Sequence, residues 1–499
     1  MELRLSATSV KLAGVPVIQS ASIRVPRWPA AAAGRPDFAA VRAEFDVPEQ
    51  FPADAVEEAE QRAAEPPFPE LDATDVPLVT LDPVGSRDLD QAVHLTARGS
   101  GYRVHYAIAD VGGFVGLGGP LDAEARRRGQ TLYTPDRRTP LHPPVLSEGA
   151  ASLLEGQLRP AVLWTIDLDS DGQPVSVDLR RARVRSRAQL DYPSMQARAD
   201  AGSLPGPLAL LPEIGSLLQQ RAAERGAIQL GTPEQEVVAG PDGGWTLVLR
   251  GDLPVEQWNA EISLLTGRCA AGLMLDGGVG VLRTLPPARP EDVERLRLLA
   301  PALGVDWPDG AGPGAVIAAL DPSRPGHAAF LEEASILLRG AAYTPFDGAP
   351  PEQPGHSGVG APYAHVTAPL RRLVDRFGTE VCLALAAGRE PAPDLRAALP
   401  ELPGLMTASD RRTRDVERAV VDATEAWLLH GREGQSFSAV VVDVEDGALP
   451  RKGTVVLDEF AVRGRCTGTT LTPGTRVAVR LAEADVAARK VRFELDGAA

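Results

Sequence analysis

Strand-like and helical segments alternate along most of this chain, and that alternation limits its fold more than any other feature. Closely spaced apolar and β-branched residues predict strands in four runs, at 76–81, 102–109, 161–168 and 175–187. Apolar residues repeat with helical spacing in two further runs, at 255–275 and 291–303. We therefore predict a multidomain α/β protein in which residues 75–390 form one large mixed α/β domain.

Composition marks the remaining boundaries in this chain of 499 residues, a length typical of about two to four domains. Residues 1–43 show no clear period and are assigned to a short N-terminal module of unknown fold. Residues 44–74 are dense in acid and form a linker helix, predicted at 53–64, and an entry segment. Residues 391–434 form a helical segment that packs on the large domain. Residues 435–499 contain short strands separated by turns, at 438–444, 453–457, 476–481 and 490–495, which predicts a small β-barrel, most naturally a five-stranded OB-fold.

Charge and cysteine content exclude several classes of protein. The formal net charge of −16 rules out a protein that coats nucleic acid by bulk attraction, so any contact with nucleic acid must be local. Cys269, Cys382 and Cys466 lie far apart and outside any zinc-binding spacing, which favours reduced thiols in a cytoplasm. The chain starts without the apolar stretch of a signal peptide and has no run of about 18 apolar residues, so we expect no membrane span.

The most informative segment is a strand that runs into a cluster of carboxylates. The apolar residues 79–81 lead into Asp82, a turn of proline, glycine and serine follows, and Asp88 and Asp90 come next. Asp88 and Asp90 are two positions apart, so an extended backbone would point both in the same direction. We expect the three side chains to converge around this turn.

Three carboxylates in one place repel one another, so their clustering makes sense mainly if a cation neutralises them. Oxygen ligands of this kind suit Mg²⁺ or Mn²⁺. Two such ions, about 3.5–4 Å apart, activate water and stabilise the leaving oxygen of a phosphodiester, which is nuclease chemistry. The alternative is a polar turn of solvated aspartates without a metal, and this segment alone leaves both interpretations open.

Several motifs, in a fixed order, resemble one known family. Asp82, Asp88 and Asp90, followed by 102–111, are similar to the opening of the RNB catalytic domain of the RNase II and RNase R family. The tail resembles the S1 domain of that family. The resemblance extends from about residue 45 to residue 495. Five further segments match in the family's order: 125–135, 146–159, 225–228, 356–372 and 411–418.

The resemblance implies an activity. A protein of this kind is a hydrolytic exoribonuclease that degrades single-stranded RNA processively from its 3′ end to nucleoside 5′-monophosphates, with Mg²⁺, or Mn²⁺ in its place, as cofactor. We therefore expect a metal-dependent enzyme of the RNase II type with single-stranded RNA as its partner. We also expect a cytoplasmic monomer without a membrane contact or an obligate protein partner.

The resemblance also implies roles for residues of the carboxylate cluster and of a later motif. Asp82, Asp88 and Asp90 would hold the metal ions and position water, and Arg371 would bind the scissile phosphate and stabilise its developing charge. Gln91 stands where the family has a fourth aspartate. As a ligand it offers a carbonyl oxygen but no charge, so one metal ion should bind more weakly or through an additional water.

Five other residues match positions that lie near RNA in the family. Tyr133 would stack on the terminal bases, and Tyr192 and Glu261 would lie near the ribose 2′-hydroxyl, which distinguishes RNA from DNA. Arg372 would make structural or more distant phosphate contacts. Glu417 resembles a glutamate close to the active site, with a salt bridge on a helix surface as the alternative.

Two other functions remain open. Gln91 supports a catalytically weak or inactive RNA-binding protein with an RNB-type fold, as in relatives that have lost catalytic carboxylates. A module that only binds RNA or protein through residues 437–495 would leave the large α/β domain unexplained. Four arginines of that tail are expected to follow backbone phosphates: Arg463, Arg465, Arg476 and Arg480.

Overall fold

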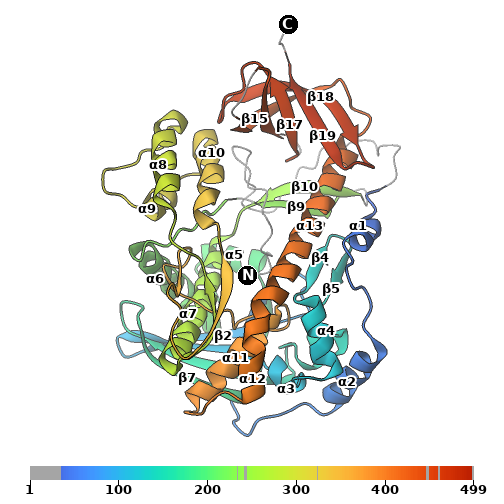
Figure 1. Cartoon of the computed structure of the whole chain (residues 1–499). Coiled ribbons are helices and arrows are strands. Elements are labelled where there is room, and N and C mark those ends of the chain that lie inside the picture. Colours follow the sequence, from blue (N-terminus) through green and yellow to red (C-terminus); the bar gives the residue numbers. More distant parts are fainter. Residues whose placement is uncertain are drawn as a thin grey trace.

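The computed structural model describes residues 35–496, apart from 233, 241–243, 323, 446–448 and 459–460. A large α/β body carries a small β-barrel at one end, and a long helix connects the two (Figure 1). The N-terminal module expected at 1–43 lies mostly outside the described residues. The first described helices are α1 (Phe38–Glu44) and α2 (Ala53–Ala64), and α2 is the expected linker helix.

A six-stranded sheet forms the centre of the body. Its strands lie in the order β7-β6-β3-β2-β1-β8, and all neighbours are antiparallel except β1 and β8. The parallel pairing places Asp82, at the end of β1, beside Asp191 of β8. The bounds are β1 Val79–Asp82, β2 Gln91–Arg98, β3 Gly101–Ala109, β6 Leu158–Leu168, β7 Pro174–Arg185 and β8 Gln189–Asp191.

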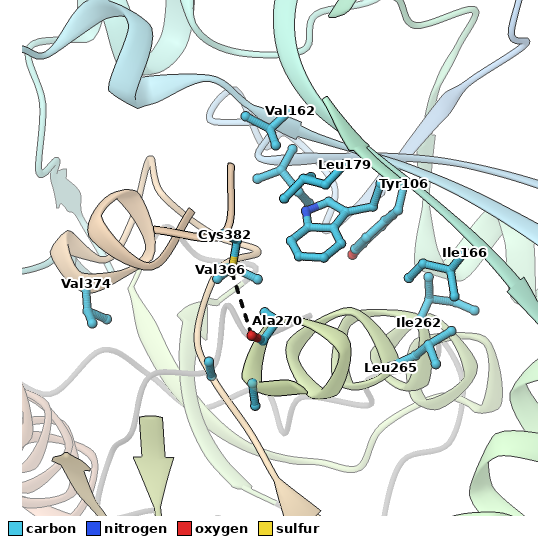
Figure 2. Packing of buried hydrophobic residues seen from close by; sticks show 14 of the residues in the cluster. Tyr106, Val162, Ile166, Leu179, Ile262, Leu265, Ala270, Val366, Val374 and Cys382 are labelled. Carbon is cyan, nitrogen blue, oxygen red and sulfur yellow. Dashed lines mark hydrogen bonds between the residues drawn. The ribbon is translucent and has the colours of Figure 1, made fainter. Parts of the chain in front are cut away.

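One face of the sheet packs against α7 (Pro254–Gly277) and α11 (Leu373–Ala386). Figure 2 shows this core, where Tyr106 of β3 and Leu179 of β7 lie across from Ile262 of α7. The same view shows Cys382 of α11 beside the carbonyl oxygen of Ala270, 3.8 Å from its sulfur. This packing fixes α11, and with it the loop in front of α11, against the sheet.

The opposite face of the sheet is covered by α2, α3 (Val111–Phe114) and α4 (Pro120–Arg128). The β3 residues that face this layer include Ala107 and Ala109, whose short side chains let the covering elements approach closely. A sheet buried on both faces needs apolar residues at successive positions. This requirement explains why the strand sequences show nearly continuous apolar runs.

Further helices and strand pairs surround the sheet. The strand pairs are β4 Leu132–Thr134 with β5 Arg137–Thr139, β9 Glu234–Ala239 with β10 Trp245–Arg250, β11 Val279–Thr284 with β12 Ala342–Asp347, and β13 Gly355–His356 with β14 Ala361–Pro362. The helices are α5 Tyr192–Asp200, α6 Leu211–Glu224, α8 Pro290–Leu299, α9 Pro313–Ala318, α10 Pro325–Ala334 and α12 Pro393–Ala398.

Helix α13 (Leu402–Leu429) connects the body to the barrel (Figure 1). Its 28 residues span about 40 Å. Apolar residues of the barrel, α13 and α10 belong to one hydrophobic cluster, so the barrel is packed on its neighbours and not merely tethered. The barrel closes in the order β15 Ser436–Val444, β16 Arg451–Leu457, β17 Arg463–Gly468, β19 Lys490–Leu495 and β18 Arg476–Asp485.

The fold class predicted from the sequence is confirmed, with a mixed α/β domain followed by a closed five-stranded barrel. The cysteines Cys269, Cys382 and Cys466 carry free thiols, as expected. Strand β17 was not recognised in the sequence because glycine, cysteine and threonine interrupt its apolar alternation. Among the helices in the described part of the chain, none is long and apolar enough to cross a membrane.

Candidate active site

Asp82 is the last residue of β1, and a tight turn redirects the chain immediately after it. The backbone N–H of Ser86 donates to the carbonyl oxygen of Pro83 at 3.2 Å, and Gly85 between them has a φ of 81°. Glycine adopts such a φ without strain, so the geometry of the turn explains its sequence. The turn leaves Asp82 at the end of a buried strand and starts the segment that carries the other two aspartates.

Leu89 anchors the two aspartates that flank it. Its side chain is fully buried, its N–H donates to Ser152 Oγ at 2.9 Å, and its carbonyl oxygen accepts from the N–H of Leu153 at 3.0 Å. Asp88 and Asp90 are 7% and 2% exposed. With Leu89 fixed in the core, both aspartates contribute to one cluster of charged side chains, as their spacing predicts.

Asp90 is held by the loop that precedes α11. Its Oδ1 accepts from the N–H of Leu370 at 2.7 Å, and its Oδ2 accepts from Nε of Arg371 at 2.8 Å. The loop is itself fixed, because the N–H of Thr131 donates to the carbonyl oxygen of Arg371 at 2.9 Å. The structure thus brings Asp90 and Arg371 together from positions 281 residues apart.

Asp88 is held by the hairpin of β4 and β5. The hydroxyl of Tyr133 donates to Asp88 Oδ2 at 2.8 Å, and Nη1 of Arg138 contacts Asp88 Oδ1. Nη2 of Arg138 also lies 2.8 Å from Oε1 of Glu148. The hydroxyl of Tyr133 therefore holds a candidate metal ligand, whereas the base stacking that the resemblance implied for Tyr133 stays a prediction.

Burial makes the ionised form of these aspartates unfavourable. It raises the pKa of Asp82 to about 6 and the pKa of Asp90 to about 7. The positive charge of Arg371 opposes both shifts, whereas the negative charge of Asp88 adds to both. Burial alone would lower the pKa of Arg371, but the charge and hydrogen bond of Asp90, together with Tyr133, raise it. The cluster is therefore short of positive charge.

The chemistry of the cluster fits a divalent cation. Oδ2 of Asp82 is buried and has no hydrogen-bond partner, which is costly for an oxygen of this kind. A hard cation such as Mg²⁺ takes carboxylate oxygens as ligands. In the described part of the chain, no three His, Cys, Asp or Glu side chains are already arranged around a metal position. Asp88 and Asp90 are instead turned towards arginines, so ion binding would compete with these contacts.

The side chain of Gln91 is engaged by neighbouring protein groups. It shares a face of β2 with the buried Val93, and both polar atoms of its amide are used within the protein. Its Oε1 accepts from the hydroxyl of Tyr106 at 2.6 Å, and its Nε2 donates to the carbonyl oxygen of Thr367 at 2.6 Å. The amide joins the loop before α11 to strand β3, and metal binding by Gln91, expected from the sequence, stays a prediction.

Tyr192 lies close to the carboxylate cluster. It begins α5, and its hydroxyl accepts from Nδ2 of Asn259 at 3.3 Å. Burial raises the pKa of Tyr192, and the charge of nearby Asp82 adds to the rise. Glu261 lies on α7 and accepts from Nε2 of Gln229 at 3.3 Å. Tyr192 is therefore in a position to contact a substrate held at Asp82.

Arg372 and Glu417 have different surroundings. Nη2 of Arg372 lies 2.7 Å from Oδ1 of Asp375, a fully buried carboxylate that also accepts from the N–H of Ala368, so Arg372 helps to hold the loop. Oε2 of Glu417 is buried without a hydrogen-bond partner. Burial raises the pKa of Glu417 to about 8, and the charge of Glu234 adds to the rise. Glu417 is therefore not the surface salt bridge left open by the sequence.

Arg138 contacts the cluster directly, although it was not among the residues predicted from the sequence. The sequence contains a signal that could have identified Arg138, because Pro135 and Asp136 are turn-forming residues between two short strands. A hairpin with this turn places Arg138 directly opposite Tyr133, and the structure has that register. Predicting the hairpin would therefore have placed Arg138 beside a residue already assigned to the site.

Known proteins resemble this chain in both sequence and fold. The RNB domain family matches residues 71–378, and the RNase II-type exonuclease C-terminal S1 domain family matches residues 435–496. Ribonuclease R of Aquifex aeolicus is 26% identical over 496 residues, covering 90% of this chain and 69% of that protein. The apo form of Mycoplasma genitalium RNase R has a TM-score of 0.80 at 20% identity, covering 92% of this chain and 77% of that chain.

The same fold occurs in yeast Ssd1, described as a pseudonuclease, with a TM-score of 0.64 at 16% identity, covering 87% of this chain and 54% of that chain. Structural likeness at such identities shows the fold alone. This chain spans 39% to 69% of the length of four curated relatives that it matches. Because the RNB match covers residues 71–378, more than half of the sequence, the chain belongs to the RNB-domain family and carries an RNase II-type S1 domain.

Proposed function

We propose that this chain is a metal-dependent exoribonuclease that hydrolyses single-stranded RNA from its 3′ end to nucleoside 5′-monophosphates. The observation that carries the proposal is the ion pair of Asp90 with Arg371 beside the buried, unpartnered oxygen of Asp82. Relatives named ribonuclease R support RNA as the substrate. We extend the proposal to processive degradation by a monomer, because a barrel packed on the body could hold RNA between successive cuts.

Asp82, Asp88 and Asp90 would hold the metal. When bound, a divalent cation such as Mg²⁺ supplies an activated water and neutralises charge on the phosphate. Arg371 is oriented before RNA arrives, because its Nε is bonded to Asp90. Its outer guanidinium nitrogens would then bind the scissile phosphate and stabilise the charge that develops there.

Tyr192 would select ribose over deoxyribose. Its hydroxyl oxygen already accepts from Asn259, so its proton remains to be donated to a ligand oxygen. A 2′-hydroxyl of the terminal nucleotide would accept that proton, and DNA lacks the group. We expect DNA to bind the same surface but to be cut slowly.

A 5′-labelled RNA oligonucleotide tests the proposal. Incubated with Mg²⁺ or Mn²⁺, it should be shortened stepwise to a short limit product with release of nucleoside 5′-monophosphates. EDTA should stop the reaction, and DNA of the same sequence should remain nearly intact. Internal cleavage, or equal cleavage of RNA and DNA, would contradict the proposed activity.

RNA binding without hydrolysis is the second candidate function. Gln91 in place of a carboxylate and the engagement of Asp88 by Arg138 favour it, because both lower the negative charge available to a metal. It predicts tight binding of single-stranded RNA, no product in either metal, and no change in either measurement on Asp90→Asn. The cleavage assay and a binding titration on the same preparation therefore separate the two functions.

A further inference from the structure

Arg138 is a second cation in the carboxylate cluster, in addition to Arg371. Its guanidinium bridges two acids, with Nη1 on Asp88 and Nη2 2.8 Å from Oε1 of Glu148. Its side chain is 23% exposed, whereas that of the neighbouring Arg137 is 46% exposed and lies 3.2 Å from Glu49. Arg138 is therefore built into the site, and Arg137 is an ordinary surface arginine.

Residues of the hairpin of β4 and β5 contact both carboxylate oxygens of Asp88. Tyr133 and Arg138 are direct cross-strand partners, and they reach Oδ2 and Oδ1 of Asp88 respectively. Neither Asp88 oxygen is left without a protein donor, unlike Oδ2 of Asp82.

The charges of the cluster limit how many metal ions it can hold. Its acids are Asp82, Asp88, Asp90 and Glu148, its cations are Arg138 and Arg371, and Gln91 adds no charge. One divalent cation would offset the remaining excess of negative charge, and a second would then be repelled. In a partly buried site this repulsion is strong, because the effective dielectric constant is well below that of water.

We propose that this site holds a single divalent cation, with Asp82 as its main ligand, and that Arg138 takes the place of a second cation at Asp88. The inference rests on the proposed metal-dependent function. Arg138 acts through Asp88 and is therefore a positioning residue. The fixed positive charge of Arg138 would stabilise the negative charge of Asp88 and of groups near it, so that no second metal ion has to bind there.

Titration of the full chain with Mn²⁺ in the absence of RNA tests the inference, with unbound Mn²⁺ followed by its electron paramagnetic resonance signal. The parent protein should bind one Mn²⁺. Arg138→Met should bind a second Mn²⁺ and hold the first about tenfold more tightly, because a positive charge has been removed. Arg138→Lys keeps the charge and should behave as the parent. Arg137→Met is the matched control, and its binding should equal that of the parent.

The stoichiometry of the parent tests the inference even if Arg138→Met does not fold, which a thermal melt would reveal. Two ions bound to the parent with similar affinity would overturn it and leave a metal-dependent nuclease intact. Unchanged binding in a folded Arg138→Met would also overturn it, since Arg138 would then have only a structural role. A parent that binds no Mn²⁺ would overturn the proposed function together with the inference.

Discussion

The carboxylate cluster and the C-terminal barrel hold their charges in opposite ways. In the cluster, Asp90 and Arg371 are 2% and 7% exposed and lie 2.8 Å apart, beside an Asp82 oxygen with no donor. On the barrel, three arginines are at least half exposed and each lies beside an acid, whereas Arg463 is 24% exposed and lies 3.1 Å from Glu332 of α10. The three exposed pairs are Arg465 with Glu445, Arg476 with Asp458, and Arg480 with Glu494.

Under the proposed function, we expect this difference to place RNA hydrolysis at the carboxylate cluster and RNA binding on the barrel. Exposed ion pairs contribute about 0–1 kcal/mol and are screened by salt, so an arriving phosphate replaces the acid at little cost. Buried charges are fixed in one geometry, and removing one partner leaves the other uncompensated. Changes in the cluster should therefore affect turnover, whereas changes on the barrel should affect RNA affinity.

The substitution Asp90→Asn tests this division between turnover and RNA affinity. Among the changes considered, we expect it to have the largest effect. The asparagine loses the anion and places an amide donor against Nε of Arg371. We expect turnover to fall by at least about 1,000-fold with RNA affinity nearly unchanged. Single-turnover rates across a Mg²⁺ titration and a binding titration measure both quantities. Asp167→Asn, which weakens the pairs of a buried carboxylate with the partly exposed Arg98 and Arg103 elsewhere in the sheet, is the control and should leave turnover intact.

Gln91→Asp distinguishes a ligand from a structural amide. Aspartate cannot donate to the carbonyl oxygen of Thr367 and is too short to keep the bond from Tyr106. We expect the free energy of unfolding to fall by about 1–3 kcal/mol, with no decrease in the Mg²⁺ concentration needed for half-maximal rate. A lower Mg²⁺ concentration for half-maximal rate, with an unchanged free energy of unfolding, would indicate that Gln91 is a metal ligand.

The double substitution of Arg465 and Arg480 by alanine tests whether the barrel binds RNA. We expect RNA affinity at low salt to fall about tenfold, and the slope of log affinity against log salt to decrease by roughly 0.7 for each phosphate that is no longer neutralised. The rate of cleavage at saturating RNA should not change. Arg396→Ala is the control, because Arg396 is paired with Asp347 on the body. A fall in the saturated rate would show that the barrel takes part in the chemistry.

Substitution is preferable to deletion of the barrel. Val441 and Phe493 of the barrel share one hydrophobic cluster with Phe330 of α10 and Leu429 of α13. Deletion of residues 437–499 would expose this surface on the body, and weaker RNA binding could then come from a less stable body as well as from the missing arginines. The exposed arginines contribute little to folding, so their substitution reports on RNA binding alone.

Glu417→Gln should have the smallest effect, and it depends on pH. The pKa of Glu417 is about 8 in the folded chain against 4.5 in an unfolded one, so the folded state alone keeps the proton between these values. The contribution of Glu417 to the stability of the parent therefore falls as pH rises from about 5 to about 8. Glu417→Gln should remove part of this fall and be about 1 kcal/mol more stable than the parent at pH 8. Denaturant melts at pH 5, 6.5 and 8 measure it, with Asp415→Asn on the exposed side of α13 as control.

Much of the fold follows from local pattern. The linker helix was predicted with the bounds it has, Ala53–Ala64, and the long α7 and the strands β3 and β19 were placed within a residue or two. These segments carry their apolar residues at the period of the element they form. Strand β17 and the hairpin of β4 and β5 were not predicted, because short strands with glycine, proline or polar residues give no such period.

The sequence by itself also determined the local geometry of the site. The turn after Asp82 requires a glycine at a φ of 81°, and the apolar Leu89 between Asp88 and Asp90 brings both to the same cluster. Each of these features depends on residues that are neighbours in the chain. They are sufficient to predict a group of carboxylates, but not what the carboxylates contact.

Only the tertiary structure decided the partners of those carboxylates. The bond between Asp90 and Arg371 joins residues 281 positions apart, and the amide of Gln91 reaches Thr367 across 276 positions. Such contacts depend on the order of strands in the sheet and on the packing of α11 against it. A repeat of apolar residues indicates which face of a helix or strand is buried, but it does not indicate which other helix or strand covers that face. For this reason the sequence indicated a metal-binding cluster, whereas the fold brought Arg138 into it and joined the amide of Gln91 to Thr367 and Tyr106.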